Sequence, residues 1–143
     1  MLTAELQRLI SRNNKDVIKV MELEKVYKNG KKALDNLSFG VEKGQIFCLL
    51  GINGAGKTTC FDVLTKNIPK TSGDVEIQGL QISDFYKNSN QVGVCAQTNT
   101  LWPSLTLQQH LAVYARIKGL KGMEAEQVIQ HLLDALQLET YAQ

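Results

Sequence analysis

The chain has 143 residues, a length suited to one domain, and its contents of 43% hydrophobic and 21% charged residues are ordinary for a globular protein. Its formal net charge of +2 is too small to indicate a nucleic-acid partner, and we expect none. The longest uncharged stretch, 88–115, is broken by polar residues and Pro103, and the first residues lack the basic and apolar regions of a signal peptide.

The beginning of the chain predicts a short helix and then a β-hairpin. Leucines at helical spacing indicate an amphipathic helix in the first dozen residues, and a polar break follows at 11–14. We interpret residues 1–14 as an N-terminal helix or linker end rather than core. Residues 16–26 and 33–41 are predicted strands, and Lys28-Asn29-Gly30-Lys31 between them is a hairpin turn.

A complete G-x-x-x-x-G-K-[ST] motif occupies residues 51–58, between an apolar run at 45–50, a predicted strand, and a predicted helix from Lys57 to about Asn67. Strand, glycine loop and helix are the context in which this motif binds the phosphates of a nucleotide. The glycines let backbone N–H groups point at phosphate oxygens, Lys57 supplies a charge, and Thr58 offers a hydroxyl to Mg²⁺. The candidate nucleotide-binding residues of this segment are Gly51, Ile52, Asn53, Gly54, Ala55, Gly56, Lys57, Thr58 and Thr59.

Two strands and two helices are predicted in the rest of the chain. After a loop at 68–73, residues 74–80 alternate as a half-buried strand does, and 91–96 form a short buried strand. Thr106-Leu107-Gln108-Gln109 matches a capping box and begins a helix that closes near Gly119. Residues 124–138 form a strongly amphipathic helix.

The three cysteines, Cys48, Cys60 and Cys95, are odd in number and contain no C-x-x-C pair. We expect reduced, packed thiols in a cytosolic compartment. Cys60, two residues after Thr58, is open to two interpretations: a thiol whose oxidation affects nucleotide binding, or an inert buried one.

From about Val17 onward the sequence resembles the nucleotide-binding domain of ATP-binding cassette (ABC) transporters. The resemblance depends on the phosphate loop, on Tyr27 at the end of the first strand, and on Val92-Gly93-Val94-Cys95-Ala96-Gln97. The stretches 51–59, 71–74 and 94–111 are most similar to eukaryotic subfamily A, the lipid-transporter branch. The implied fold class is an α/β P-loop NTPase, the ABC ATPase core with an antiparallel β subdomain, truncated at the helical subdomain. Residues 15–143 would then be a partial ATP-binding domain.

The resemblance implies a role for three further residues and names ATP and Mg²⁺ as cofactors. Tyr27 would stack on adenine, as a rigid π-face can, and Gln97 would ligand Mg²⁺ together with Thr58. Trp102 would face the membrane domain. The alternatives are a tyrosine that covers the core, a glutamine on the surface, and a tryptophan in the core.

The sequence also departs from the pattern of the family. Ala96 stands where the family usually has Pro, Gln109 where it usually has Glu, and Cys60 where it usually has a third Thr. The signature motif, the strand ending Asp-Glu and the switch histidine are expected after Gln143. As substitutes we considered Asp84, Asp134, His110 and His131. Helix faces explain the last three better, and Asp84 does not follow the unbroken apolar strand that such a residue would need. With no general base in this chain, we expect negligible ATP hydrolysis by it alone.

The leading hypothesis is therefore the ATP-binding part of an ABC-type ATPase that couples ATP binding and hydrolysis to transmembrane transport, with lipid as the expected cargo. Its partners would be a membrane-spanning domain and a second nucleotide-binding domain, at the cytoplasmic face of a membrane. The alternative is a standalone nucleotide-binding or interaction module without hydrolysis. A third interpretation, a P-loop kinase or GTPase, lacks support because we find no N-K-x-D-like segment.

Overall fold

The computed structural model describes residues 3–11, 15–88 and 92–141. The chain divides into two units, Met1–Val94 and Cys95–Gln143, and each is described by itself. None of the helices in the described ranges is long and apolar enough to cross a membrane.

The first unit is built on a four-stranded sheet in the order β2-β1-β3-β4, with all neighbours antiparallel. Its strands are β1 (Asp16–Val26), β2 (Lys32–Glu42), β3 (Ser72–Ile77) and β4 (Leu80–Gln81). The predicted hairpin is confirmed, since Tyr27 N–H donates to the Lys31 carbonyl at 2.9 Å and Gly30 has a φ of +79°. The strand predicted at 74–80 is interrupted by a turn at 78–79, where Gln78 and Gly79 both have positive φ.

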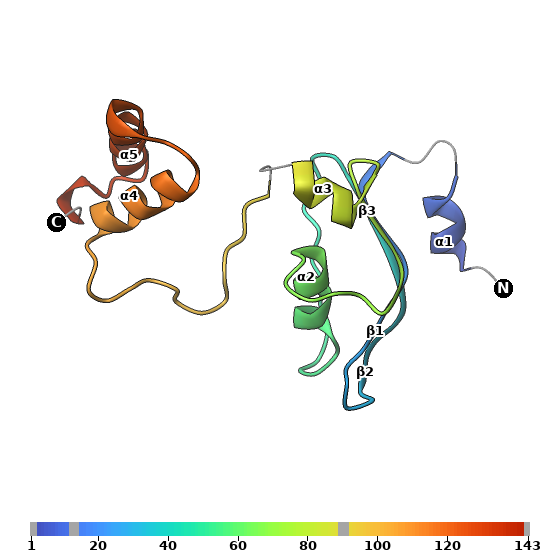
Figure 1. Cartoon of the computed structure of the whole chain (residues 1–143). Helices are drawn as coiled ribbons and strands as arrows, with labels where there is room; N and C mark the ends of the chain where they lie inside the picture. The colour runs from blue at the N-terminus through green and yellow to red at the C-terminus, as the bar shows by residue number, and fades with distance from the viewer. Residues whose placement is uncertain (1–2, 12–14, 89–91, 142–143) are drawn as a thin grey trace. The chain divides into compact units, whose positions relative to one another are not determined.

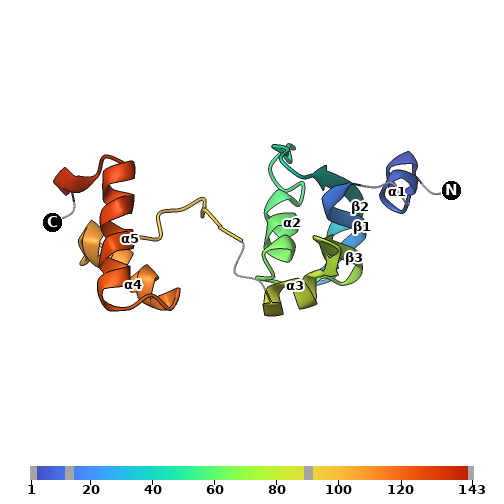
Figure 2. The ribbon, with the colours of Figure 1, turned by 90° about the horizontal axis from the view of Figure 1, so that it is seen from above.

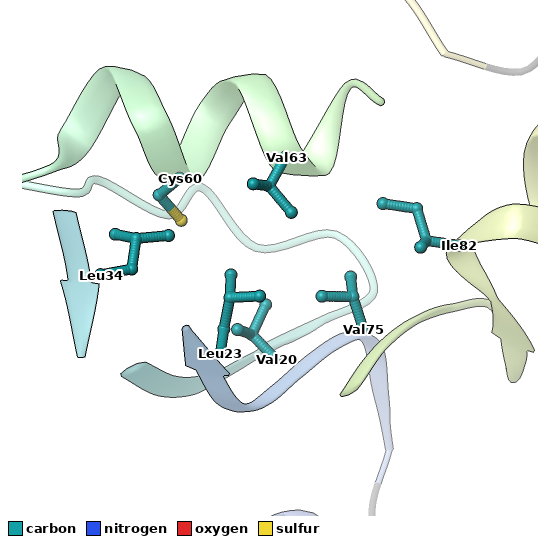
Figure 3. Packing of buried hydrophobic residues seen from close by; sticks show 7 residues of the cluster. All are labelled: Val20, Leu23, Leu34, Cys60, Val63, Val75 and Ile82. Atoms are coloured by element: carbon teal, nitrogen blue, oxygen red, sulfur yellow. The ribbon is translucent and has the colours of Figure 1, made fainter. Parts of the chain in front are cut away.

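Helices cover both faces of this sheet. Figures 1 and 2 show α1 (Ala4–Leu9) on one face and α2 (Lys57–Leu64) with α3 (Ile82–Asn88) on the other. The main core lies under α2 and α3 (Figure 3) and buries apolar side chains from three strands and both helices. Its buried members are Val20, Leu23, Leu34, Cys60, Val63, Val75 and Ile82.

Helix α1 contributes to the core, contrary to the expectation that this segment lies outside it. Leu6 and Leu9 are both buried, with exposures of 6% and 1%. Arg8 Nη1 lies 2.9 Å from Oδ2 of Asp16, at the start of β1. A side chain at Gly40 in β2 would meet Asp16 and Leu9, so the glycine gives the helix room to dock. Helical spacing revealed the helix but not the surface that receives it.

Two predicted strands are not formed. Residues 45–50 and 92–96 are irregular, and residue 91 lies outside the described part of the chain. A strand needs a neighbour that completes its backbone hydrogen bonds, and no described segment pairs with 45–50. Phe47 nevertheless stacks on Phe39 of β2 at 4.7 Å, while Ile46 and Leu50 are largely exposed. Helix α3, in contrast, was not predicted from the sequence.

The second unit contains α4 (Leu107–Ile117), α5 (Gly122–Ala135) and a short 3₁₀ helix (Glu139–Tyr141). The predicted capping box is present, because Gln109 N–H donates to Oγ1 of Thr106 and Thr106 N–H donates to Oε1 of Gln109. Ala115, Ile129 and Leu133 form the buried contact between the two helices. The predicted helices thus exist, although α5 begins and ends earlier than expected.

Candidate functional site

The phosphate-binding motif forms a curled loop that leads directly into α2. Gly54 and Gly56 have φ values of +85° and +91°, a region that favours glycine, and Gly56 is the N-terminal cap of the helix. Ala55 N–H donates to the Ile52 carbonyl at 3.2 Å inside the curl. The sequence thus places glycines where the backbone has to turn.

Gly56 also lets the loop lie against β2. A Cβ at this position would lie 2.4 Å from the carbonyl oxygen of Ala33 and 2.9 Å from Cδ2 of Leu34. No side chain larger than hydrogen fits without movement. At Gly54 a Cβ would meet nothing within 4 Å, so that glycine is required by its φ alone. The two glycines therefore serve different purposes.

The ammonium group of Lys57 occupies the mouth of the loop. Its Nζ donates to the carbonyl oxygens of Gly51 and Ile52, both at 2.7 Å. These contacts hold the charge where the loop closes on itself. The first turn of α2 contains no acidic residue of its own that would weaken the positive end of the helix. Loop, lysine and helix end together present positive charge and N–H groups to one place, which suits an anion.

Tyr27 lies close to this helix although 32 residues separate it from Thr59. Its hydroxyl is 3.2 Å from Oγ1 of Thr59 in the first turn of α2, and the Nζ of Lys25 lies over its ring, 5.5 Å from the centroid. The side chain is 37% exposed. The structure therefore brings Tyr27 beside the loop helix and leaves part of its ring accessible.

A cavity of about 340 Å³ lies beside the contact between the loop and β2. It is lined by apolar residues of β2 and of 49–50, and by Asp35, Ala55, Gly56 and Lys57.

The two residues predicted to bind Mg²⁺ belong to different units of the chain. Thr58 is exposed on α2, whereas Gln97 is exposed in an irregular segment of the second unit. Their joint role as metal ligands stays a prediction.

In the second unit, Trp102 belongs to an aromatic stack on α4. Its ring lies 5.5 Å from that of His110 and 6.4 Å from that of Tyr114, and it is 47% exposed. His110 is buried, with Nδ1 3.0 Å from the Thr106 carbonyl and Nε2 2.8 Å from the backbone nitrogen of Trp102. It joins two segments and is more than the helix-face residue expected from the sequence, whereas His131 is exposed.

The carboxylates considered as a general base or metal ligand lie in helices. Asp84 is in α3 and Asp134 in α5, so neither ends a strand. Asp84 forms an ion pair with Lys87 at 3.0 Å, and Asp134 accepts a hydrogen bond from Gln130 at 2.7 Å. The interpretation of Asp134 as a helix residue is confirmed, and Asp84, rejected because no unbroken apolar strand precedes it, lies in the unpredicted helix α3.

The three cysteines differ in their exposure to solvent. Cys60 is fully buried on the inner face of α2, and burial raises the pKa of its thiol from the ordinary 9.0 to about 11. Cys48 and Cys95 are exposed free thiols, so the expectation of packed thiols is wrong for these two. Both lie in the apolar runs that did not become strands, which explains why nothing covers them.

Sequence reasoning missed one contributor to the site, Lys25. Its side chain is buried, its Nζ donates to the Pro69 carbonyl, and the same ammonium covers the ring of Tyr27. A lysine in a strand carries no pattern that marks such a contact. The contact becomes visible only in the tertiary structure, where the loop after α2 lies close to the end of β1.

Both the family profile and individual relatives show that this sequence is similar to ABC transporters. The profile described as ABC transporter matches residues 34–143. The chain is 42% identical to the mouse retinal-specific phospholipid-transporting ATPase ABCA4 over 144 aligned positions, and 34% identical to human ATP-binding cassette sub-family A member 2 over 147. These alignments cover 96% and 99% of the chain but 6% of each relative, so the chain corresponds to a small part of their length.

A solved structure titled as the ATP binding subunit of an ABC transporter superposes with a TM-score of 0.70 and 28% identity. The superposition covers 88% of this chain and 52% of the other. This match confirms the predicted fold class, a partial α/β P-loop ATPase with an antiparallel β subdomain.

Proposed function

Because the chain belongs to the ABC transporter family, whose ATPase domains bind ATP and couple its hydrolysis to transport, we propose that residues 51–58 hold the triphosphate of ATP. The observation that carries the proposal is the loop geometry: two positive-φ glycines, the Lys57 ammonium at the mouth of the loop, and a first turn of α2 that contains no acidic residue. This arrangement suits a polyphosphate anion.

In the proposed complex, Lys57 exchanges its carbonyl contacts for phosphate oxygens, and the backbone N–H groups of the loop hold the remaining ones. Thr58 and Gln97 are the proposed ligands of Mg²⁺, which neutralises phosphate charge when bound. Tyr27 is the proposed stacking partner of the adenine ring, since it lies beside the same helix and is partly exposed. The fit to Mg²⁺ depends on oxygen donors, and both side chains offer one.

At the level of the machine, we propose that this chain is the ATP-binding part of a lipid transporter of subfamily A, at the cytoplasmic face of a membrane. It would act with a membrane-spanning domain and a second nucleotide-binding domain. The similarity to a phospholipid-transporting relative supports the choice of cargo. The half-exposed Trp102 and its aromatic neighbours support a protein contact at this part of the second unit.

We further propose that this chain binds ATP without appreciable turnover. Both carboxylates considered as a general base or metal ligand, Asp84 and Asp134, lie in helices and are engaged with neighbours on those helices. Purified chain should release phosphate at the rate of a Lys57→Ala variant. Phosphate release that depends on Lys57 would contradict this part of the proposal.

Calorimetric titration with Mg²⁺-ATP tests the central proposal. Lys57→Ala should abolish or greatly weaken binding, because the loop then lacks its point charge. Lys43→Ala is the matched control, an exposed lysine after β2 outside the loop, and should bind as the parent does. Equal binding by the Lys57 variant and the parent would refute the site. Titration with GTP tests the GTPase interpretation, which requires GTP to bind at least as tightly as ATP.

A further inference from the structure

The contact between Tyr27 and Thr59 joins the proposed base-binding end of the site to the phosphate-binding end. Tyr27 is the first residue after β1, and its backbone is held by the hairpin through the Lys31 and Gly30 hydrogen bonds. Thr59 is the third residue of α2, directly after Lys57 and Thr58. The two hydroxyl oxygens lie 3.2 Å apart, within hydrogen-bond distance.

The ring is held from a second direction by Lys25. This buried ammonium lies 5.5 Å from the ring centroid, in the range of a cation–π contact, and donates to the Pro69 carbonyl. One face of the Tyr27 ring is therefore under a charge that is itself anchored. The hydroxyl contact at the end of the ring limits the remaining rotation of the side chain.

We propose that Thr59 is a positioning residue for Tyr27, which it holds in the orientation that receives a purine base on the ring face away from Lys25. This inference rests on the proposed function and deepens it. An aromatic side chain that is already oriented loses less rotamer freedom when a base stacks on it, and binding is stronger for that reason. The ligand class is a purine nucleoside triphosphate. Its base would stack on Tyr27, and its phosphates would bind the loop that leads into α2, the helix that Tyr27 contacts.

The test compares two ligands, Mg²⁺-ATP and Mg²⁺ with inorganic triphosphate, which has the phosphates but no base. Thr59→Val removes the hydroxyl at nearly constant shape, and Thr59→Ser keeps it. Tyr27→Phe removes the other hydroxyl and keeps the ring. Each single loss of a hydroxyl should weaken ATP binding about fivefold, the value of one ordinary hydrogen bond, and leave triphosphate binding unchanged. Thr59→Ser should bind ATP as the parent does.

The double variant Thr59→Val with Tyr27→Phe should bind ATP no more weakly than either single variant, because both remove the same bond. Additive losses, or an equal loss of triphosphate affinity, would assign Thr59 to the phosphates and overturn the inference. If Thr59→Val fails to fold, Tyr27→Phe alone decides, since an unchanged ATP affinity would also overturn it.

Tyr27→Ala separates this inference from the function on which it rests. If that variant binds ATP as the parent does, the proposed stacking role of Tyr27 is wrong. If it loses ATP affinity while Thr59→Val and Tyr27→Phe do not, stacking stands and only the positioning role of Thr59 is refuted.

Discussion

The imidazole of His110 accepts a hydrogen bond of 2.8 Å from the backbone N–H of Trp102 and also stacks on the indole ring of that residue. Its other nitrogen faces the Thr106 carbonyl at 3.0 Å, so Nδ1 donates and Nε2 accepts. A single buried side chain thus fixes the segment before α4 to the first turn of that helix.

Replacing His110 should release Trp102. His110→Ala leaves the Trp102 N–H without its acceptor and removes the stacking partner, so the indole should become more mobile and more solvated. Trp102 is the only tryptophan of the sequence. Intrinsic fluorescence therefore reports on it alone and should show a red-shifted emission maximum and lower anisotropy. The exposed His131→Ala is the control; equal spectra for both variants would refute the role of His110.

The two loop glycines should differ in their tolerance of alanine. Gly56→Ala places a methyl group 2.4 Å from the Ala33 carbonyl and also forces a positive φ. Gly54→Ala has the positive φ but no close neighbour. The φ alone should cost about 1–3 kcal/mol of unfolding free energy, and Gly56→Ala should lose clearly more.

Urea unfolding monitored by circular dichroism measures that difference. Gly56→Ala should show the lower midpoint of the two variants. Equal midpoints would mean that the loop does not lie against β2 as the structure shows.

Cys60 should make stability fall at alkaline pH. Below pH 9 the thiol is protonated in both folded and unfolded chains, so its contribution is fully present. Between the ordinary pKa of 9.0 and the folded value of about 11, the unfolded chain releases the proton and the folded chain does not. Rising pH therefore favours unfolding, by up to about 3 kcal/mol for a shift of this size.

The comparison with Cys60→Ala isolates this effect. Burial also raises the pKa of Tyr86, and that contribution is common to both proteins. Unfolding free energies measured from pH 8 to 11 should converge as the pH rises, because only the parent loses stability through the thiol. A constant difference over that range would contradict a buried, protonated Cys60.

The ion pair between Arg8 and Asp16 should contribute more to stability than the exposed pair between Arg8 and Glu5. Asp16 has a buried carboxylate whose charged partner is Arg8, at 2.9 Å. Arg8→Ala should therefore destabilise the first unit by about 1–2 kcal/mol. Glu5→Ala removes the exposed pair of Glu5 with Arg8 and should have a smaller effect.

Hydrogen exchange of the amides in α1 gives a local measurement of the same pair. Protection should fall in Arg8→Ala and persist in Glu5→Ala. If both variants keep full protection, the two buried leucines alone hold the helix and the ion pair is dispensable.

Several features followed from the sequence alone because their causes are local. The hairpin turn needs a residue of positive φ, which Gly30 supplies, and the capping box needs only Thr106 and Gln109 three residues apart. The phosphate loop is likewise a local turn set by Gly54 and Gly56. Such features are determined by residues that are neighbours in the chain, so their spacing in the sequence is sufficient.

Tertiary structure decided what depends on partners distant in the chain. The apolar run at 45–50 has the composition of a strand, yet it remains irregular because no described segment offers a backbone to pair with it. Three further features depend in the same way on which surfaces pack together. They are the contact of Tyr27 with Thr59, the position of the Lys25 ammonium over the Tyr27 ring, and the burial of His110. Composition and spacing identify the residues that can bind a phosphate, whereas the packing of α2 against β1 and β2 determines which side chains stand around them.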